Sequence, residues 1–179
     1  MTTTEPLSQR RSGLHHGWLV LVMGTLVVFG SLGLARFSYS VVLPAMQKGL
    51  GMDNRVGVAL ATANLAGYLS FCVIGGLLAS HLGPRRVIAA GLALAGVSMI
   101  MTGLARSVWA AGLWRALAGV GSGASNVPVM GLLAAWFAPR RRGLATGVAV
   151  TGSSIGLILV GPLVPRIIAA DPAGGWRTC

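Results

Sequence analysis

Five long stretches of mostly apolar residues follow one another along the chain, and each is interrupted by at most one charged residue. They cover residues 17–43, 56–80, 87–105, 107–138 and 143–165. At about 1.5 Å of rise per helical residue, each can cross a hydrocarbon core about 30 Å thick. Barrel strands would be about half as long and would alternate polar with apolar residues. The pattern predicts an all-α integral membrane protein with five transmembrane helices over residues 17–179, after a polar cytoplasmic tail at residues 1–16.

The composition supports lipid as the solvent for most of the surface. Hydrophobic residues make up 54% of the chain and charged residues only 9%, whereas about a quarter of the residues in a soluble domain are charged. The net charge of +11 raises the question of nucleic-acid binding. The arginines stand singly or in short groups between uncharged stretches, which is typical of membrane loops, so we expect no nucleic-acid partner.

The basic residues also predict an orientation. With the N-terminus inside, seven Lys and Arg residues fall on the cytoplasmic side and five on the other. The cytoplasmic set is Arg10, Arg11, Arg85, Arg86, Arg140, Arg141 and Arg142, and the opposite set is Lys48, Arg55, Arg106, Arg166 and Arg177. The cytoplasmic residues are grouped at helix ends, where the positive-inside rule applies. We therefore expect a multi-pass protein of a bacterial inner (plasma) membrane with a cytoplasmic N-terminus.

The loop between the second and third stretches has a distinctive order of residues. It contains Gly76, Ser80, Gly83, Arg85 and Arg86, with a proline between the last glycine and the arginines. Gly76 permits close helix contact, the glycine–proline pair makes a tight turn, and the paired arginines suit anionic headgroups. Ser80 can cap a helix or turn. Elsewhere, glycines four residues apart predict close helix packing: Gly119 and Gly123, Gly143 and Gly147, and Gly152 and Gly156.

This loop resembles the signature loop of the major facilitator superfamily, and two later segments agree. Arg115, followed by Gly119 and Gly121, is similar to the family's fourth-helix motif, and residues 136–147 resemble its usual start of the fifth helix. Gly156 and residues 161–162 resemble the glycine–proline pattern later in that helix. Ser80 stands where the family usually has Asp, so the charge network that this acid serves in the family is not implied here. Residues 33–46 also look like those of one bacterial branch of small-molecule transporters and exporters.

The resemblance implies a fold and an activity. Family members have twelve helices in two six-helix halves, so this chain resembles an N-terminal half that stops before a sixth helix. The implied function is secondary active transport of a small solute by alternating access, coupled to protons or another gradient, with the missing C-terminal half as partner. The alternative is a five-span accessory or structural membrane protein without transport activity of its own.

Two arginines inside the spans are the first candidates for substrate binding. A charge within a span costs at least about 2.5–3.5 kcal/mol, so it usually faces a cavity or a partner. Counted from the predicted outer ends at Leu43 and Ser107, Arg36 and Arg115 lie about 10–12 Å deep. No acidic residue lies in the five stretches, so the pair suits clamping a carboxylate or phosphate of a small organic anion. Alternatively, Arg36 reaches the outer headgroups and Arg115 bonds carbonyls at a helix break or assists a proton step, as the resemblance implies.

Helical spacing supplies the remaining candidates. Asn126 shares a face with Arg115, and Asn64 shares a face with Tyr68. Tyr39 and Tyr68 suit stacking on a substrate, although packing between helices explains the tyrosines and asparagines as well. The predicted substrate-binding residues are Arg36, Arg115, Tyr39, Asn64, Tyr68 and Asn126.

Other chemistries find little support in the sequence. The acids Glu5, Asp53 and Asp171 all lie outside the stretches, which argues against an enzyme. The three histidines have no cysteine or acidic companions, so we expect no metal site and no cofactor. The glycine-rich residues 119–123 lack the Lys-Ser/Thr ending of a nucleotide-binding loop.

Overall fold

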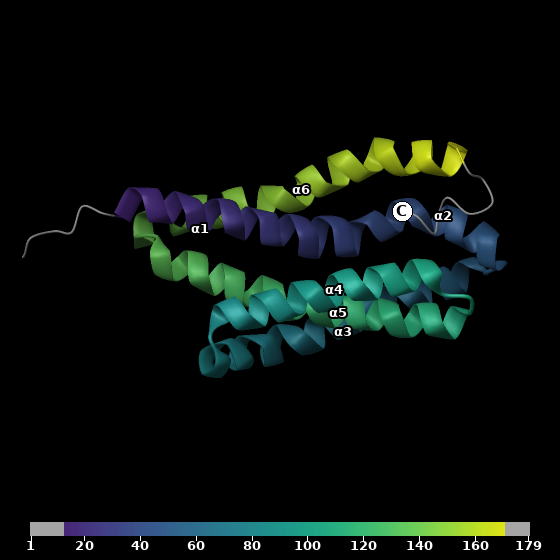
Figure 1. Ribbon diagram of the computed structural model, residues 1–179, viewed down its shortest axis with the longest axis horizontal. Helices are drawn as coiled ribbons and strands as arrows, with labels where there is room; N and C mark the ends of the chain where they lie inside the picture. The colour runs from purple at the N-terminus through teal and green to yellow at the C-terminus, as the bar shows by residue number, and fades with distance from the viewer. Residues whose placement is uncertain (1–12, 171–179) are drawn as a thin grey trace, which may run out of the picture.

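The computed structural model describes the backbone of residues 13–170 and the side chains of residues 17–47 and 51–169. Every element in this range is a helix (Figure 1). The elements are α1 (Gly13–Val28), η1 (Phe29–Phe37), α2 (Ser38–Leu50), α3 (Asn54–Leu82), α4 (Pro84–Leu104), α5 (Val108–Trp136) and α6 (Pro139–Ala170). The first three form one continuous span, so five helices are long and apolar enough to cross a membrane. The prediction of five transmembrane helices is confirmed.

The helix ends follow from local chemistry. The Asp53 carboxylate accepts a hydrogen bond from the Asn54 N–H (2.7 Å), and the Ser107 hydroxyl accepts one from the Ala110 N–H (3.3 Å). These side chains satisfy N–H groups that have no partner within the first turn. Gly51 ends α2 with a φ of 61°, a left-handed conformation that glycine adopts without steric penalty.

The first span differs from the sequence-based expectation in two ways. The helix continues through Pro44 to Leu50, whereas the first stretch was expected to end at residue 43. A proline is tolerated inside a membrane helix because neighbouring groups satisfy the carbonyl that it leaves free. The span also begins at Gly13, within the stretch read as a polar tail, while residues 1–12 of that tail lie outside the described residues.

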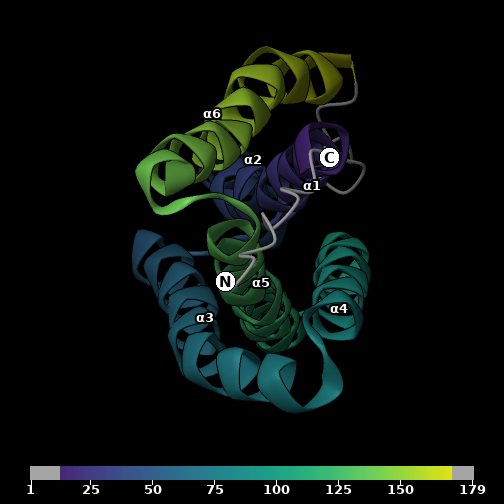
Figure 2. The same cartoon turned by 90° about the vertical axis from the view of Figure 1, so that its left-hand side faces the viewer.

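The bundle is organised around α5. An end-on view shows α5 between α3 and α4, with the first span and α6 as a second pair on its other side (Figure 2). Close approach along α5 depends on glycine, because a Cβ on Gly119 would overlap the Asn64 carbonyl and one on Gly121 would overlap the Gly91 carbonyl. In the second pair, a Cβ on Gly156 would lie 2.7 Å from the Gly33 Cα.

The predicted glycine pairs have different outcomes. Gly119 and Gly123 lie against the α3 backbone, and Gly152 and Gly156 lie against the first span, so both predictions are confirmed. The prediction for Gly143 and Gly147 is not met within the described residues, where a Cβ on either glycine would have no atom of another helix within 4 Å. Gly76 also faces α5, but the closer backbone approach is at the preceding glycine. A Cβ on Gly76 would meet only the Val127 side chain at 3.5 Å, whereas one on Gly75 would lie 2.7 Å from the Ala124 Cα.

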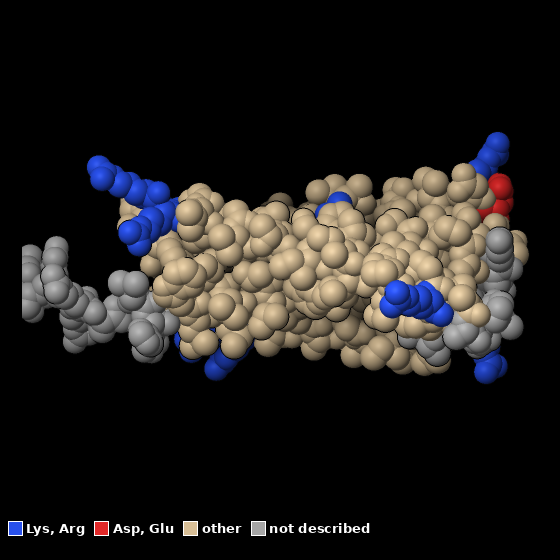
Figure 3. Space-filling view, turned by 90° about the horizontal axis from the view of Figure 1, so that it is seen from above, with Lys and Arg blue, Asp and Glu red and all other residues tan. Residues whose placement is uncertain are grey.

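Charges and apolar side chains divide the surface as a bilayer requires. Lys and Arg side chains gather at the two ends of the molecule, and the long middle is almost free of charge on the face in view (Figure 3). Large apolar side chains remain exposed along the helices, among them Trp18, Leu69, Val73, Leu113 and Ile158. Exposure of this extent fits contact with lipid tails rather than with water.

Candidate functional site

The first span carries two of the predicted site residues where its helix widens. Residues Phe29–Phe37 form the π-helix η1, which contains Arg36, and Tyr39 lies in the first turn of α2. π-helical turns close through i→i+5 hydrogen bonds and occur frequently at functional sites. The segment contacts both α5 and α6.

Arg36 lies partly exposed between helices and stacks on aromatic rings. Its guanidinium carbon is 4.6 Å from the centroid of the Tyr68 ring and 5.8 Å from that of Phe37. Asn126 on α5 donates an Nδ2–H to the Tyr68 hydroxyl at 2.9 Å. Arg36, Tyr68 and Asn126 thus form a connected set drawn from three spans, and all are partly exposed. We call these residues the open group.

Arg115 lies in a second set that is closed to solvent. Its side chain is 3% exposed, its Nη1 donates to the Ala35 carbonyl at 3.2 Å, and its guanidinium carbon is 4.1 Å from the Tyr39 ring centroid. Asn64 donates to the Arg115 carbonyl at 2.8 Å, and the Tyr39 hydroxyl donates to the Gly57 carbonyl at 3.2 Å. Arg115, Tyr39 and Asn64 are all buried and form the buried group.

Both groups contain a polar atom without a protein partner. The Arg115 Nε and the Asn126 Oδ1 are buried, and neither has a hydrogen-bond partner among the described residues. Burying an unpaired polar group costs about 1–3 kcal/mol. The same holds for Ser31 Oγ and Ser98 Oγ, and an ordered water or a ligand group can satisfy such an atom.

The six predicted residues come together in a way that the sequence did not show. The first span, α3 and α5 each contribute one residue to each group. The two arginines stack on different tyrosines, and α2 runs seven residues beyond the point from which the depth of Arg36 was counted. The Arg115 guanidinium nevertheless reaches the Ala35 carbonyl, next to Arg36. Equal depth of the two arginines and direct contact of each residue with a substrate stay predictions.

One contact was missed at the sequence level, and another was expected only as an alternative. Phe37 flanks the Arg36 guanidinium, and the Ala35 carbonyl accepts from Arg115. The exposed aromatic residue next to Arg36 was a usable signal. A carbonyl at a helix break was the alternative expected for Arg115, and the Ala35 carbonyl lies in the π-helical segment η1.

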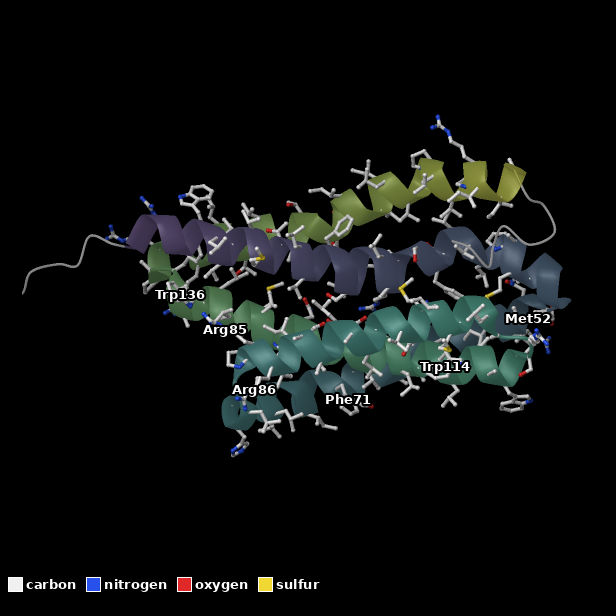
Figure 4. All side chains as sticks on the ribbon, in the orientation of Figure 1. Met52, Phe71, Arg85, Arg86, Trp114 and Trp136 are labelled. Carbon is white, nitrogen blue, oxygen red and sulfur yellow. The ribbon has the colours of Figure 1, made fainter. Side chains whose placement is uncertain are left out.

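The signature loop lies at one end of the bundle. Gly83 has a φ of 88° and Pro84 begins α4, so the expected tight turn is present. Ser80 donates to the Leu77 carbonyl of its own helix at 2.7 Å, so it does not cap the turn. Arg85 and Arg86 are exposed at the same end as Trp136, opposite Met52 (Figure 4). Within residues 13–170, no three His, Cys, Asp or Glu residues are grouped as metal ligands.

Comparison with known proteins gives a consistent family assignment. Residues 25–179 match the sequence model of the Major Facilitator Superfamily. The chain is 27% identical over 142 residues to a probable sulfoacetate transporter of Cupriavidus necator, covering 79% of this chain and 32% of that protein. It is 30% identical over 146 residues to a probable hexose phosphate transport protein of Chlamydia pneumoniae, covering 79% and 30%. A probable chloroplastic anion transporter of Arabidopsis thaliana is 29% identical over 136 residues, covering 75% and 26%. The chain thus spans about a third of the length of these curated relatives.

Proposed function

The chain belongs to the Major Facilitator Superfamily, and on this premise we propose that it supplies the first five helices of a secondary transporter for a small organic anion. Alternating access in such folds needs two helical bundles that rock about a central site. We therefore propose that a C-terminal half completes the transporter, and "intact transporter" below means this chain with that half. The proposed transport is coupled to protons or to another gradient.

The observation that carries the anion proposal is the position of Arg36. It lies within a membrane span, is partly exposed, and has no carboxylate in any of the five spans to neutralise it. Stacking on Tyr68 occupies a face of the guanidinium and leaves the N–H groups at its edge for a ligand. That edge matches carboxylate, sulfonate and phosphate groups, which accept two parallel hydrogen bonds.

The names of the relatives support the same substrate class. Sulfoacetate and hexose phosphates, named for two of them, are small organic anions, and a third is named as an anion transporter. Those activities belong to the relatives. Their shared feature is negative charge on a small solute, which is the chemistry that Arg36 is suited to bind.

The distribution of charge supports an orientation for the proposed transporter. Among the described residues, the end that carries the signature loop has five exposed arginines and the opposite end has three. The first set is Arg85, Arg86, Arg140, Arg141 and Arg142, and the second is Arg55, Arg106 and Arg166. Under the positive-inside rule we propose that the signature-loop end faces the cytoplasm of a bacterial inner membrane, which places the N-terminus there too.

A ligand screen tests the proposed substrate class. The intact transporter in detergent is heated with sulfonates, carboxylates, phosphate esters, neutral sugars and aromatic compounds, and its unfolding temperature is recorded. We expect some anions to raise that temperature, because a ligand stabilises the folded state to which it binds. Arg36→Ala should abolish the shift, whereas Arg55→Ala, which removes an exposed arginine from the first turn of α3, should keep it. Stabilisation only by neutral compounds would overturn the anion proposal, and stabilisation by no solute would favour the accessory role.

A further inference from the structure

The buried Arg115 is in an energetically expensive position. It is 3% exposed, and the described part of the chain offers no carboxylate within the spans. The neutral Ala35 carbonyl and the Tyr39 ring are its side-chain contacts, and its Nε has no described partner. An arginine that only filled space here would be replaceable by an uncharged residue at a gain in stability. The position therefore points to a role beyond packing.

The contact that Arg115 makes lies inside the π-helix. Most π-helical turns are single insertions in α-helices, whereas η1 extends over nine residues. Two neighbouring helices, α5 and α6, contact this stretch. Arg115 supplies a hydrogen bond from α5 at Ala35. The backbone of α6 packs closely against Gly33. A Cβ on Gly33 would lie 3.1 Å from the Gly156 Cα and 3.2 Å from the Ser153 carbonyl oxygen.

Ala35 is the link between the two arginines. It is directly followed by Arg36, whose guanidinium lies on Tyr68. A π-helix has more residues in each turn than an α-helix, so a change from π to α geometry would rotate the following side chains about the helix axis. The direction in which Arg36 points is thus tied to the geometry at Ala35.

We propose that Arg115 is a positioning residue for anion binding. Its hydrogen bond to the Ala35 carbonyl holds the π-helical turn and thereby keeps the Arg36 guanidinium on Tyr68, where the substrate anion meets it. The inference rests on the proposed function, because it needs Arg36 to contact the anion. In this proposal the buried group (Arg115, Tyr39 and Asn64) stabilises the packing of the helices. The open group (Arg36, Tyr68 and Asn126) binds the anion.

A double-mutant cycle on the intact transporter separates positioning from direct contact. The Kd of a stabilising anion found in the screen is measured for the unsubstituted transporter, Arg36→Ala, Arg115→Ala and the double variant. We expect Arg115→Ala to raise the Kd about tenfold, and to have little further effect once Arg36 is alanine, because residues that act through one another are not additive. Independent effects that add in the double variant would overturn the proposal.

Hydrogen exchange supplies a readout that a general loss of stability would not mimic. Arg115→Ala should speed amide exchange in a peptide that covers residues 29–37 more than in one from α4, while Arg36→Ala should leave both unchanged. Uniform acceleration in both peptides would overturn the positioning role. If Arg115→Ala does not fold, Arg115→Lys keeps a charged donor, and affinity and exchange at η1 should then change together or both stay unchanged. A change in only one of them would contradict the proposal.

The same cycle distinguishes failure of this inference from failure of the proposed function. If Arg36→Ala leaves the Kd of the anion unchanged, the proposed function is wrong and the inference is wrong with it. If Arg36→Ala weakens binding but Arg115→Ala does not, the proposed function stands and the positioning role alone is excluded.

Discussion

The guanidinium carbon of Arg36 lies 4.6 Å from the centroid of the Tyr68 ring, although 32 residues separate the two in the chain. The glycines of α5 make this contact possible. A Cβ on Gly119 would lie 3.0 Å from the Tyr68 N, and one on Gly123 would overlap the Tyr68 carbonyl. The α3 backbone can therefore approach α5 closely enough for Asn126 to bond the Tyr68 hydroxyl. Close packing at the α5 glycines thus holds the Tyr68 ring in the position where it contacts the Arg36 guanidinium.

Removing the Arg36 guanidinium should weaken anion binding strongly. A charged hydrogen-bond pair contributes about 1.5–3 kcal/mol, so Arg36→Ala should raise the Kd of an anion roughly 10- to 100-fold. Arg36→Lys should recover only part of the affinity, since an ammonium group cannot form the planar two-bond contact. Isothermal titration calorimetry on the intact transporter measures both variants. Arg55→Ala is the control, and an equal loss in that variant would show that net charge matters rather than the site.

The two functions of Tyr68 can be separated by substitution. Tyr68→Phe keeps the ring beneath Arg36 and removes the hydroxyl that bonds Asn126, whereas Tyr68→Leu removes both. A cation–π contact contributes about 0.5–2 kcal/mol, so Tyr68→Leu should bind an anion about 2- to 30-fold more weakly than Tyr68→Phe. Competition binding with a labelled anion gives the ratio. Equal affinities for the two variants would rule out a role for the stacked ring.

The close contact between α3 and α5 predicts a large stability effect at one glycine. In Gly119→Ala the new methyl group would overlap the Asn64 carbonyl, so we expect a loss of about 1–3 kcal/mol of unfolding free energy. Gly147→Ala is the matched control, because open space surrounds that residue and alanine favours helix by about 1 kcal/mol. Thermal unfolding in detergent compares the two. A Gly119→Ala variant as stable as Gly147→Ala would refute the packing described here.

The orientation can be read by cysteine labelling in intact cells. The two cysteines of the chain are first replaced by Cys72→Ala and Cys179→Ala. In this background, Arg141→Cys should react with a membrane-impermeant maleimide only after the membrane is permeabilised. Arg106→Cys should react with an impermeant maleimide from outside, because Arg106 is exposed at the opposite end. The reverse pattern would invert the proposed topology, and reaction of both from outside would contradict the five-span arrangement.

The sequence predicts the helical architecture well because one physical signal determines it. Long uncharged stretches must be helices in lipid, where every backbone polar group needs an internal partner. Contacts made by glycines were harder to predict, because the spacing of glycines does not show which face of a helix packs against a neighbouring helix. Gly119 and Gly152 pack against other helices, whereas Gly143 and Gly147 do not.

The contacts among the six candidate residues could not be predicted from the sequence, and their role in substrate binding stays a prediction. The two arginines were singled out because a charge within a span is costly. Asn64, Tyr68 and Asn126 were singled out by helical spacing, and Tyr39 as a ring suited to stacking. Their division into an open group and a buried group depends on the π-helix and on the Ala35 carbonyl. Both are properties of the packed backbone. The order of residues in the first span does not show where its helix becomes a π-helix.

The most direct test of the account is uptake of a radiolabelled organic anion by proteoliposomes that contain the intact transporter. We predict saturable uptake of at least one small sulfonate, carboxylate or phosphate ester, with Arg36→Ala reducing it at least tenfold and Arg55→Ala leaving it unchanged. Uptake of neutral solutes alone, or anion uptake that survives Arg36→Ala, would contradict the central claim.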